Sequence, residues 1–143
     1  MENKQAISKI LIYGNAKTKE AVIRRALSLK EGQKYNTDLI EESRKKLMDL
    51  EIFTHVDIEI KKSDEGVILL VIIKEKPSIS FSPHLIYAEE TYKSYFGFEL
   101  GYKNLSGKNQ KLWLTTAVGN LKKIEFGYQN NYYIDFFWGV SLS

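Results

Sequence analysis

The chain offers few residues whose types and spacing could carry out enzymatic or metal chemistry. It contains no cysteine, which excludes disulfides and thiolate zinc sites, and its two histidines, His55 and His84, lie far apart in the sequence. This spacing does not favour a metal cluster or a histidine-based catalytic pair. The adjacent acidic pairs Glu41-Glu42 and Glu89-Glu90 cannot share a helix or strand face, so each is expected to be solvated rather than catalytic.

Basic residues are scattered along the chain in the same way. The basic pairs are Arg24-Arg25, Lys45-Lys46, Lys61-Lys62 and Lys122-Lys123. They are interleaved with acidic residues, and the formal net charge of +3 at pH 7 is a mild excess, so solvation rather than phosphate binding is expected. No glycine-rich phosphate loop and no nucleophile-base motif stands out. We therefore predict no enzymatic activity, no cofactor, no metal site and no small-molecule substrate.

The chemistry that remains is hydrogen bonding by backbone groups at the edge of a β-sheet. Residues 53–61 alternate, which is typical of a strand with one solvated face. Phe53, His55, Asp57, Glu59 and Lys61 are expected on that face, and Thr54, Val56, Ile58 and Ile60 on the other. At a sheet edge, free backbone groups invite an added strand from a partner. The candidate docking residues are Thr54, His55, Val56, Asp57, Ile58, Glu59 and Ile60. The alternative is that the edge is merely tolerated and is protected by its charges.

An uninterrupted apolar run, Val67–Ile73, is expected to be the central strand against which this edge strand pairs. The run is rich in β-branched residues, is too short for a membrane helix and has no polar face. Such a run is typical of a strand at the middle of a sheet or buried on both sides. The turn residues Asp64-Glu65-Gly66 join it to residues 53–61 as a hairpin. Ile7–Tyr13, which ends at the turn pair Gly14-Asn15, is expected to form the other edge.

Two amphipathic helices are predicted between the first strand and the hairpin. The first is expected to begin at an N-cap Thr18 with Glu20 in its first turn, and the second at an N-cap Asn36. Their apolar stripes are Val22, Ile23, Ala26 and Leu27 in the first, and Leu39, Ile40, Leu47 and Leu50 in the second. The order is thus β-α-α-β-β. A crossover through the helices permits parallel pairing of the first strand with the central run, and the helices should cover one face.

Composition changes at Pro77, which predicts two structural parts. Residues 1–76 hold 28 charged and three aromatic side chains, whereas residues 77–143 hold 11 charged and 15 aromatic ones. Residues 1–5 contain no apolar segment and no cleavage site, so no signal peptide is expected in this chain. A protein that works outside the cytoplasm would then need a further segment upstream.

The second part predicts an antiparallel meander. Its alternating runs are Phe96–Lys103, Lys111–Val118, Ile124–Gln129 and Ile134–Leu142, with Phe81–Tyr87 as a fifth, weaker strand. One face carries aromatic and aliphatic side chains, and the other carries Gly, Glu, Lys, Gln and Ser. Strands of about 9–11 residues with two such faces fit a barrel with lipid outside and water inside. A soluble sheet with one buried face fits the same alternation, and this alternative stays open.

The order β-α-α-β-β is also the beginning of a KH domain, which grips a nucleic-acid backbone with a GXXG loop between two helices. The corresponding loop here, Lys30–Lys34, has a single glycine. No third helix is predicted after Val67–Ile73, because Pro77 and aromatic β-structure follow. A KH-like RNA-binding module is therefore the alternative from another functional class, and nucleic acid is not the predicted partner.

The first 76 residues resemble a POTRA domain. The matching features are Ile10–Asn15 (ILIYGN), Leu29–Asn36 (LKEGQKYN), the helix-to-strand passage Leu47–Val56 and the strand end Ile73–Pro77. The following segment is similar to the opening strands of an Omp85-type (bacterial surface antigen) barrel, including Gly101–Gly107 (GYKNLSG). The two features in this order cover nearly the whole chain.

The resemblance implies an α+β fold, with a POTRA domain over residues 1–77 and the N-terminal strands of an Omp85-type barrel over residues 78–143. It implies a factor of the Omp85/BamA class in the bacterial outer membrane, which acts without a cofactor and whose POTRA domain faces the periplasm. The implied partners are unfolded outer-membrane proteins, assembly-complex subunits and, through residues 94–143, the lipid bilayer.

Two further expectations come with the resemblance. An Omp85-related exporter, such as a two-partner secretion transporter or a barrel linked to a patatin-like lipase, is the alternative within the family. Because a closed barrel needs at least about 8 strands, four or five strands are expected to be part of a longer barrel.

Overall fold

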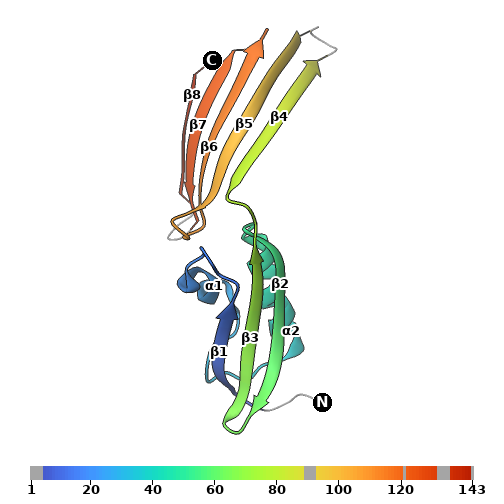
Figure 1. The fold of residues 1–143 in the computed structure, drawn as a ribbon, viewed down its shortest axis with the longest axis vertical. Helices are drawn as coiled ribbons and strands as arrows, with labels where there is room; N and C mark the ends of the chain where they lie inside the picture. Colours follow the sequence, from blue (N-terminus) through green and yellow to red (C-terminus); the bar gives the residue numbers. More distant parts are fainter. Residues whose placement is uncertain (1–4, 89–92, 121, 132–135, 143) are drawn as a thin grey trace. The chain divides into compact units, whose positions relative to one another are not determined.

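The computed structural model describes residues 5–88, 93–120, 122–131 and 136–142, and the chain forms two compact units, residues 1–76 and 77–143. Unit 1 contains β1 (Ile7–Tyr13), α1 (Glu20–Ala26), α2 (Thr37–Asp49), β2 (Phe53–Ser63) and β3 (Gly66–Glu75) (Figure 1). Unit 2 contains β4 (Ile79–Ala88), β5 (Lys93–Leu105), β6 (Gln110–Gly119), β7 (Lys123–Asn130) and β8 (Phe136–Leu142). The predicted α+β fold class is confirmed. Two sequence-predicted features, Glu89-Glu90 and the start of the last strand at residues 134–135, lie outside the described residues.

The apolar run of β3 is the centre of the unit 1 sheet, as predicted. The strand order is β1-β3-β2, with β1 parallel and β2 antiparallel to β3. Val67, Leu69 and Val71 are fully buried because their side chains face the core. Ile72, on the opposite face, is 36% exposed, so only one face of this central strand is fully covered.

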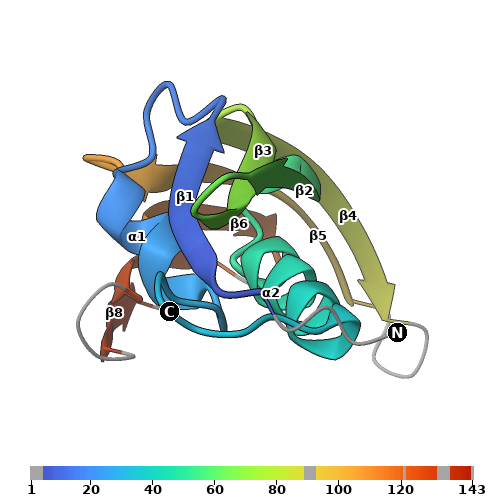
Figure 2. The same cartoon turned by 90° about the horizontal axis from the view of Figure 1, so that it is seen from below.

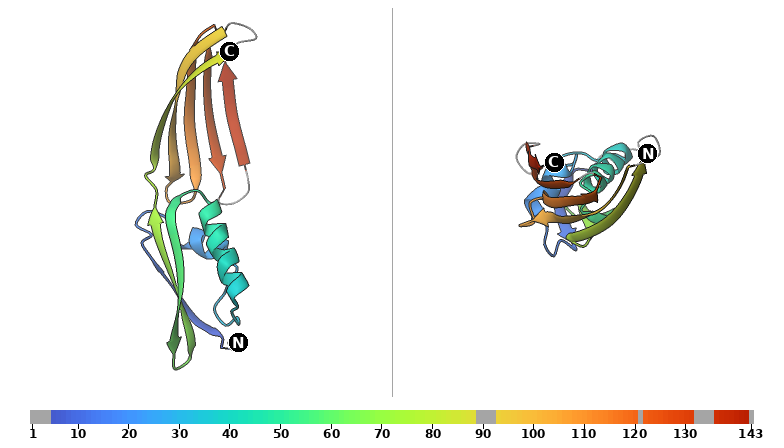
Figure 3. Two further views of the ribbon diagram at one scale, coloured as in Figure 1. Left: turned by 90° about the vertical axis from the view of Figure 1, so that its right-hand side faces the viewer. Right: turned by 90° about the horizontal axis from the view of Figure 1, so that it is seen from above.

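Both helices lie on the same face of the sheet, which confirms that prediction (Figure 2; Figure 3, left). They bury Ile23 from α1, and Ile40 and Leu47 from α2, in one core with the strands. Asn36 caps α2 as predicted, since its side chain accepts a hydrogen bond from the N–H of Leu39 at 2.8 Å. Within the described ranges, no helix has the length and apolar character needed to cross a membrane.

The predicted N-cap of α1 is wrong. The cap position is Lys19, which makes no side-chain capping bond, and Thr18 is buried. Instead, the N–H groups of Thr18 and Lys17 donate to the carboxylate of Glu75 at 2.6 and 3.1 Å. The backbone N–H groups of this loop are therefore satisfied by Glu75, at the end of β3. Because Glu75 is distant in the sequence, the residue spacing around Thr18 could not predict this contact.

Unit 2 is a single antiparallel sheet in the order β4-β5-β6-β7-β8, which confirms the predicted meander (Figure 3). The weaker predicted strand is part of β4, which pairs with β5 along its full length, from Ile79 opposite Tyr102 to Ala88 opposite Lys93. The β5–β6 turn is held by the buried Asn104, whose Oδ1 accepts from the N–H of Asn109 at 3.0 Å.

Candidate strand-docking edge

Strand β2 has one edge to which no strand is paired within the residues that the structure describes. The N–H of Ile58 donates to the side chain of its neighbour Asp57 at 2.9 Å, so it points away from β3. In an antiparallel ladder, residues alternate between those that face the partner strand and those that face away. The backbone groups of Val56, Ile60 and Lys62 therefore also point outward. We call this row of outward backbone groups the β2 edge.

A β-bulge changes which face the first residues of β2 occupy. Phe53 is opposite Glu75 and His55 is opposite Lys74, which leaves Thr54 as an extra residue whose Oγ1 donates to the carbonyl of Lys74 at 3.1 Å. Phe53 is consequently fully buried, although strict alternation predicted it on the solvated face. Thr54 is exposed, although it was predicted on the core face. Both predictions are wrong for the same reason, because one inserted residue inverts the alternation.

The predicted docking residues divide into two groups. Val56 and Ile58 bury their side chains in the core and offer only backbone groups, while Ile60 is 38% exposed. His55 and Glu59 are exposed and Asp57 is half-buried on the open face of the sheet, with backbone groups turned toward β3. Lys62 is not among the predicted docking residues, because the alternating pattern predicts a strand that ends at Lys61, whereas β2 extends to Ser63.

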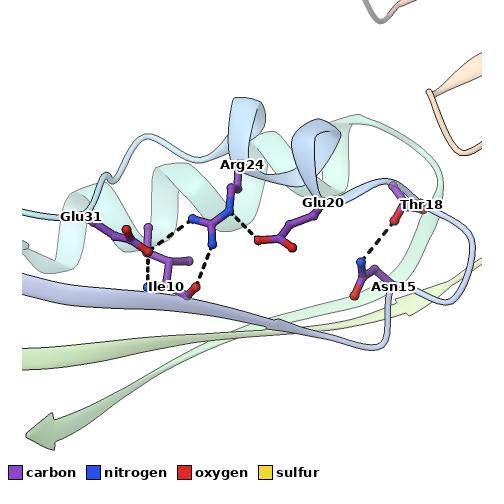
Figure 4. Close-up of polar contacts among 6 residues, drawn as sticks. All are labelled: Ile10, Asn15, Thr18, Glu20, Arg24 and Glu31. Carbon is purple, nitrogen blue, oxygen red and sulfur yellow. Dashed lines mark hydrogen bonds and ion pairs between the residues drawn. The ribbon is translucent and has the colours of Figure 1, made fainter.

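The opposite edge of the sheet, at β1, is closed by side chains (Figure 4). The N–H of Ile10 donates to Oε1 of Glu31 at 2.9 Å, and its carbonyl accepts from Nη2 of Arg24 at 3.0 Å. Glu20 on α1 holds Arg24 in place at 2.6 Å. The two outward groups of Ile10 are therefore already occupied, and an added strand would have to displace them.

The loop between the helices completes this closure. The N–H of Ile7 donates to the carbonyl of Gln33 at 2.9 Å, and the N–H of Gly32 donates to the carbonyl of Ile7 at 2.7 Å. A bridge between Ala6 and Lys34 extends the pairing. The loop that a KH domain would use to grip phosphates is thus paired with β1, which argues against the RNA-binding alternative.

Charge strengthens the closed edge. The N–H of Ile10 and, secondarily, the guanidinium of Arg24 hold the pKa of Glu31 below its ordinary value, because both favour the ionised carboxylate. The hydrogen bond to Glu20 is the main cause that raises the pKa of Arg24. The β1 edge is therefore closed most firmly when Glu31 is ionised.

We expect Glu31→Gln to reduce the loss of stability in acid. A carboxyl whose pKa is lowered in the folded state stabilises the fold above its ordinary value of 4.5, and this contribution is lost as the pH falls through the lowered pKa. Glutamine does not titrate, so the free energy of unfolding should vary less between about pH 3 and pH 6. Urea unfolding at several pH values, followed by helical circular dichroism, measures the change. The control is Glu65→Gln in the exposed β2–β3 turn. Equal pH dependence of the two variants would show that Glu31 does not carry this effect.

The histidines and the described acidic pair that the sequence singles out do not form a common site in the part of the chain that the structure describes. His55 lies in β2 of unit 1, and His84 lies in β4 of unit 2. Glu41 and Glu42 each pair with a basic residue of their own helix, at 3.4 and 2.7 Å, as solvated charges do. No group of three His, Cys, Asp or Glu side chains in the described ranges could hold a metal ion.

Unit 2 exposes its apolar face. The large exposed side chains, between 44 and 75% accessible, are Ile79, Phe81, Leu85, Phe96, Leu100, Val118, Ile124, Phe126 and Val140. Strand register places them on one face, since Phe81 is opposite Leu100 and both Leu100 and Phe126 are opposite Leu114. The part of the chain that the structure describes does not bury this face, and a contiguous exposed apolar surface of this kind marks an interaction site.

The other face of unit 2 is polar and closely packed. Gly127 leaves room for the ring of Trp113, because a Cβ at this glycine would lie 2.1 Å from a ring carbon. Lys111 lies over the same ring at 5.1 Å and approaches Glu99 at 3.8 Å. Unit 2 thus has an exposed apolar face opposite a polar face that carries ion pairs.

Comparisons with known proteins agree with both units. The family model "Surface antigen variable number repeat" (POTRA) matches residues 5–76. The outer membrane protein assembly factor BamA of Neorickettsia risticii (strain Illinois) is 34% identical over 135 residues, which are 93% of this chain and 17% of the relative.

Solved structures share the fold. BamA from Haemophilus ducreyi lacking POTRA domains 1–3 matches 97% of this chain and 27% of its own, with a TM-score of 0.76 and 17% identity. CdiB from Escherichia coli matches 87% of this chain and 25% of its own, with a TM-score of 0.61 and 16% identity. The chain spans 17% of the curated relative's length. From the family-model match and the relative that runs through both units, the chain belongs to the Omp85/BamA family, with a POTRA domain over residues 5–76.

Proposed function

We propose that the β2 edge of this POTRA domain binds unfolded outer-membrane polypeptide, or a subunit of an assembly complex, as an added strand during barrel assembly. The observation that carries the proposal is the contrast between the two sheet edges. On β1, side chains and the inter-helix loop occupy the outward groups of Ile7 and Ile10. β2 instead presents outward backbone groups at Val56, Ile60 and Lys62, and its occupied outward N–H is that of Ile58, which the neighbouring Asp57 accepts.

Backbone recognition suits a protein that handles many different clients. An added strand gains its affinity from main-chain hydrogen bonds, which do not depend on the client's sequence. The side chains beside the edge add modest selectivity. Such binding involves no bond making or breaking in the client, so the role is non-enzymatic and needs no cofactor.

We assign residues 78–143 to the first strands of an outer-membrane barrel, with the apolar face against lipid through residues 94–143. The exposed apolar face and the polar opposite face support this assignment. The POTRA domain would then lie in the periplasm beside the outer membrane. The name of the 34% identical relative favours assembly over the exporter alternative. In the exporter alternative the same edge would receive an exported protein.

Proline at residue 60 tests the docking edge. Ile60→Pro removes an outward N–H but no ladder bond to β3, and proline is tolerated at such edge positions. We expect binding of a labelled peptide that copies residues 123–130, a barrel-type strand of this chain, to weaken roughly tenfold, because a lost bond and a steric block together exceed about 1.4 kcal/mol. Fluorescence anisotropy with the full chain in detergent micelles gives the affinity.

The matched control is Ile60→Ala, which loses the same half-exposed side chain and keeps the N–H. It should bind the peptide with nearly wild-type affinity. If Ile60→Pro retains its helical circular dichroism and still binds as the wild type does, then β2 is not the docking edge.

A further inference from the structure

One side chain occupies the middle of the β2 edge. The carboxylate of Asp57 accepts the N–H of Ile58 at 2.9 Å through Oδ1. The same oxygen accepts Nη2 of Arg44, from α2, at 3.2 Å. Arg44 is also held by Glu41 of its own helix at 3.4 Å. The contact thus joins β2 to α2 across the position where an added strand would lie.

The carboxylate stands where a docked strand would place a carbonyl oxygen. An added strand bonds to outward N–H groups through its own carbonyls, and Ile58 provides one of these N–H groups. While Asp57 accepts this N–H, the strand cannot. Asp57 is therefore a competitor built into the chain, and charged side chains that guard an edge in this way are a known protection against unwanted pairing.

A docking strand can displace the Asp57 carboxylate at a low cost in free energy. The side chains of Arg44 and Asp57 are 37% and 42% exposed, so solvent screens their attraction. Peptide binding needs only a rotation of the Asp57 side chain away from the edge, because its backbone is paired with β3. A docked strand can then complete the row of bonds at the β2 edge.

Displacement of Asp57 takes away one of the two carboxylates that pair with Arg44, beside the docked strand. The Nε of Arg44 is buried and has no hydrogen-bond partner in the part of the chain that the structure describes. Without Asp57, only Glu41 would balance the guanidinium. A carboxylate is the group that a guanidinium binds best, so the vacated position favours an acidic side chain in the occupant.

We propose that Asp57 latches the β2 edge, and that the edge selects extended strands whose acidic side chain replaces Asp57 on Arg44. This inference rests on the proposed docking function and names its selectivity. It makes Asp57 and Arg44 determinants of which client strands bind, in addition to the backbone row that any strand could use.

The latch predicts that removing Asp57 strengthens binding. With the peptide that copies residues 123–130, Asp57→Ala should bind roughly three- to tenfold more tightly than the wild type, since the competing bond is gone. Glu59→Ala is the matched control, because it removes the same charge from the same face two residues along and keeps Asp57, the acceptor of the Ile58 N–H. Asp57→Val, with a strand-forming side chain that accepts no hydrogen bond, serves as a second variant if Asp57→Ala loses helical signal.

A double-mutant cycle tests the acidic preference. The peptide contains one acidic residue, the equivalent of Glu125, and a second peptide carries Gln there. The wild-type chain should prefer the acidic peptide severalfold, and Arg44→Gln should abolish the preference. A preference that persists in Arg44→Gln would overturn the assignment of Arg44.

Peptide binding by these variants distinguishes a failure of the Asp57 latch from a failure of strand docking at the β2 edge. If Asp57→Ala and the wild type bind the peptide equally well, the latch is overturned while docking stands. If neither chain binds the peptide, and no amide signal of the β2 edge changes, both the docking function and the latch are overturned. Tighter binding by Asp57→Ala and unchanged binding by Glu59→Ala support the latch.

Discussion

Gly14→Ala should destabilise unit 1 by about 3 kcal/mol or more. Gly14 follows β1 with a φ of +88°, a conformation that costs a residue with a Cβ about 1–2 kcal/mol. A Cβ at this position would also lie 2.0 Å from the carbonyl oxygen of Ile73, which is backbone of the central strand. Relieving such an overlap typically costs a further 1–3 kcal/mol or so. Urea unfolding of the full chain in micelles, followed by helical circular dichroism, measures the loss, because both described helices belong to unit 1.

Gly32→Ala is the matched control for this prediction. Gly32 has a similar φ of +83°, but nothing lies within 4 Å of a Cβ placed there. Only the backbone strain remains, so the expected loss is about 1–2 kcal/mol. Equal losses for the two variants would show that β1 does not approach β3 closely at Gly14.

Phe53→Ala should destabilise unit 1 by about 3–5 kcal/mol, as the removal of a fully buried aromatic side chain does. Phe53 is 0% exposed, because the bulge at Thr54 turns its ring into the core with Val56. Strict alternation would leave the ring in solvent, and the same substitution would then change stability little. The experiment therefore tests the bulge as well as the core.

Tyr13→Ala provides the comparison within the same sheet. Tyr13 is an aromatic residue of β1 on the open face and is 53% exposed. Its loss should destabilise the unit by less than about 1 kcal/mol. If Phe53→Ala were as mild as Tyr13→Ala, the buried position of Phe53 would be contradicted.

Much of the fold is encoded in local patterns of the sequence. The run Val67–Ile73 predicts a central strand, because a strand at the edge of the sheet would leave these apolar side chains exposed to solvent. The cap at Asn36 predicts the start of α2 within one residue. The alternation after Pro77 predicts the five strands of unit 2. What could not be predicted depends on partners distant in the sequence, such as the carboxylate of Glu75 that takes the amides beside Thr18.

The sequence predicts where the candidate docking edge lies, but not which of its backbone groups point outward or which side chains contact them. Polar alternation predicts an edge strand over residues 53–61, and this strand is at the edge of the sheet. Which backbone groups point outward depends on the register with β3, and the bulge at Thr54 shifts that register. The contact of Asp57 with Arg44 joins a strand to a helix through two side chains, and neither spacing nor composition encodes it.

Amide hydrogen exchange at the β2 edge tests the central claim most directly. The full chain in micelles is labelled with ¹⁵N, and exchange is compared with and without the peptide that copies residues 123–130. We predict that the amides of Ile60 and Lys62 become protected, because a docked strand accepts their outward N–H groups, while the already closed Ile10 amide at β1 does not change. Peptide binding that leaves Ile60 and Lys62 unprotected would contradict the account.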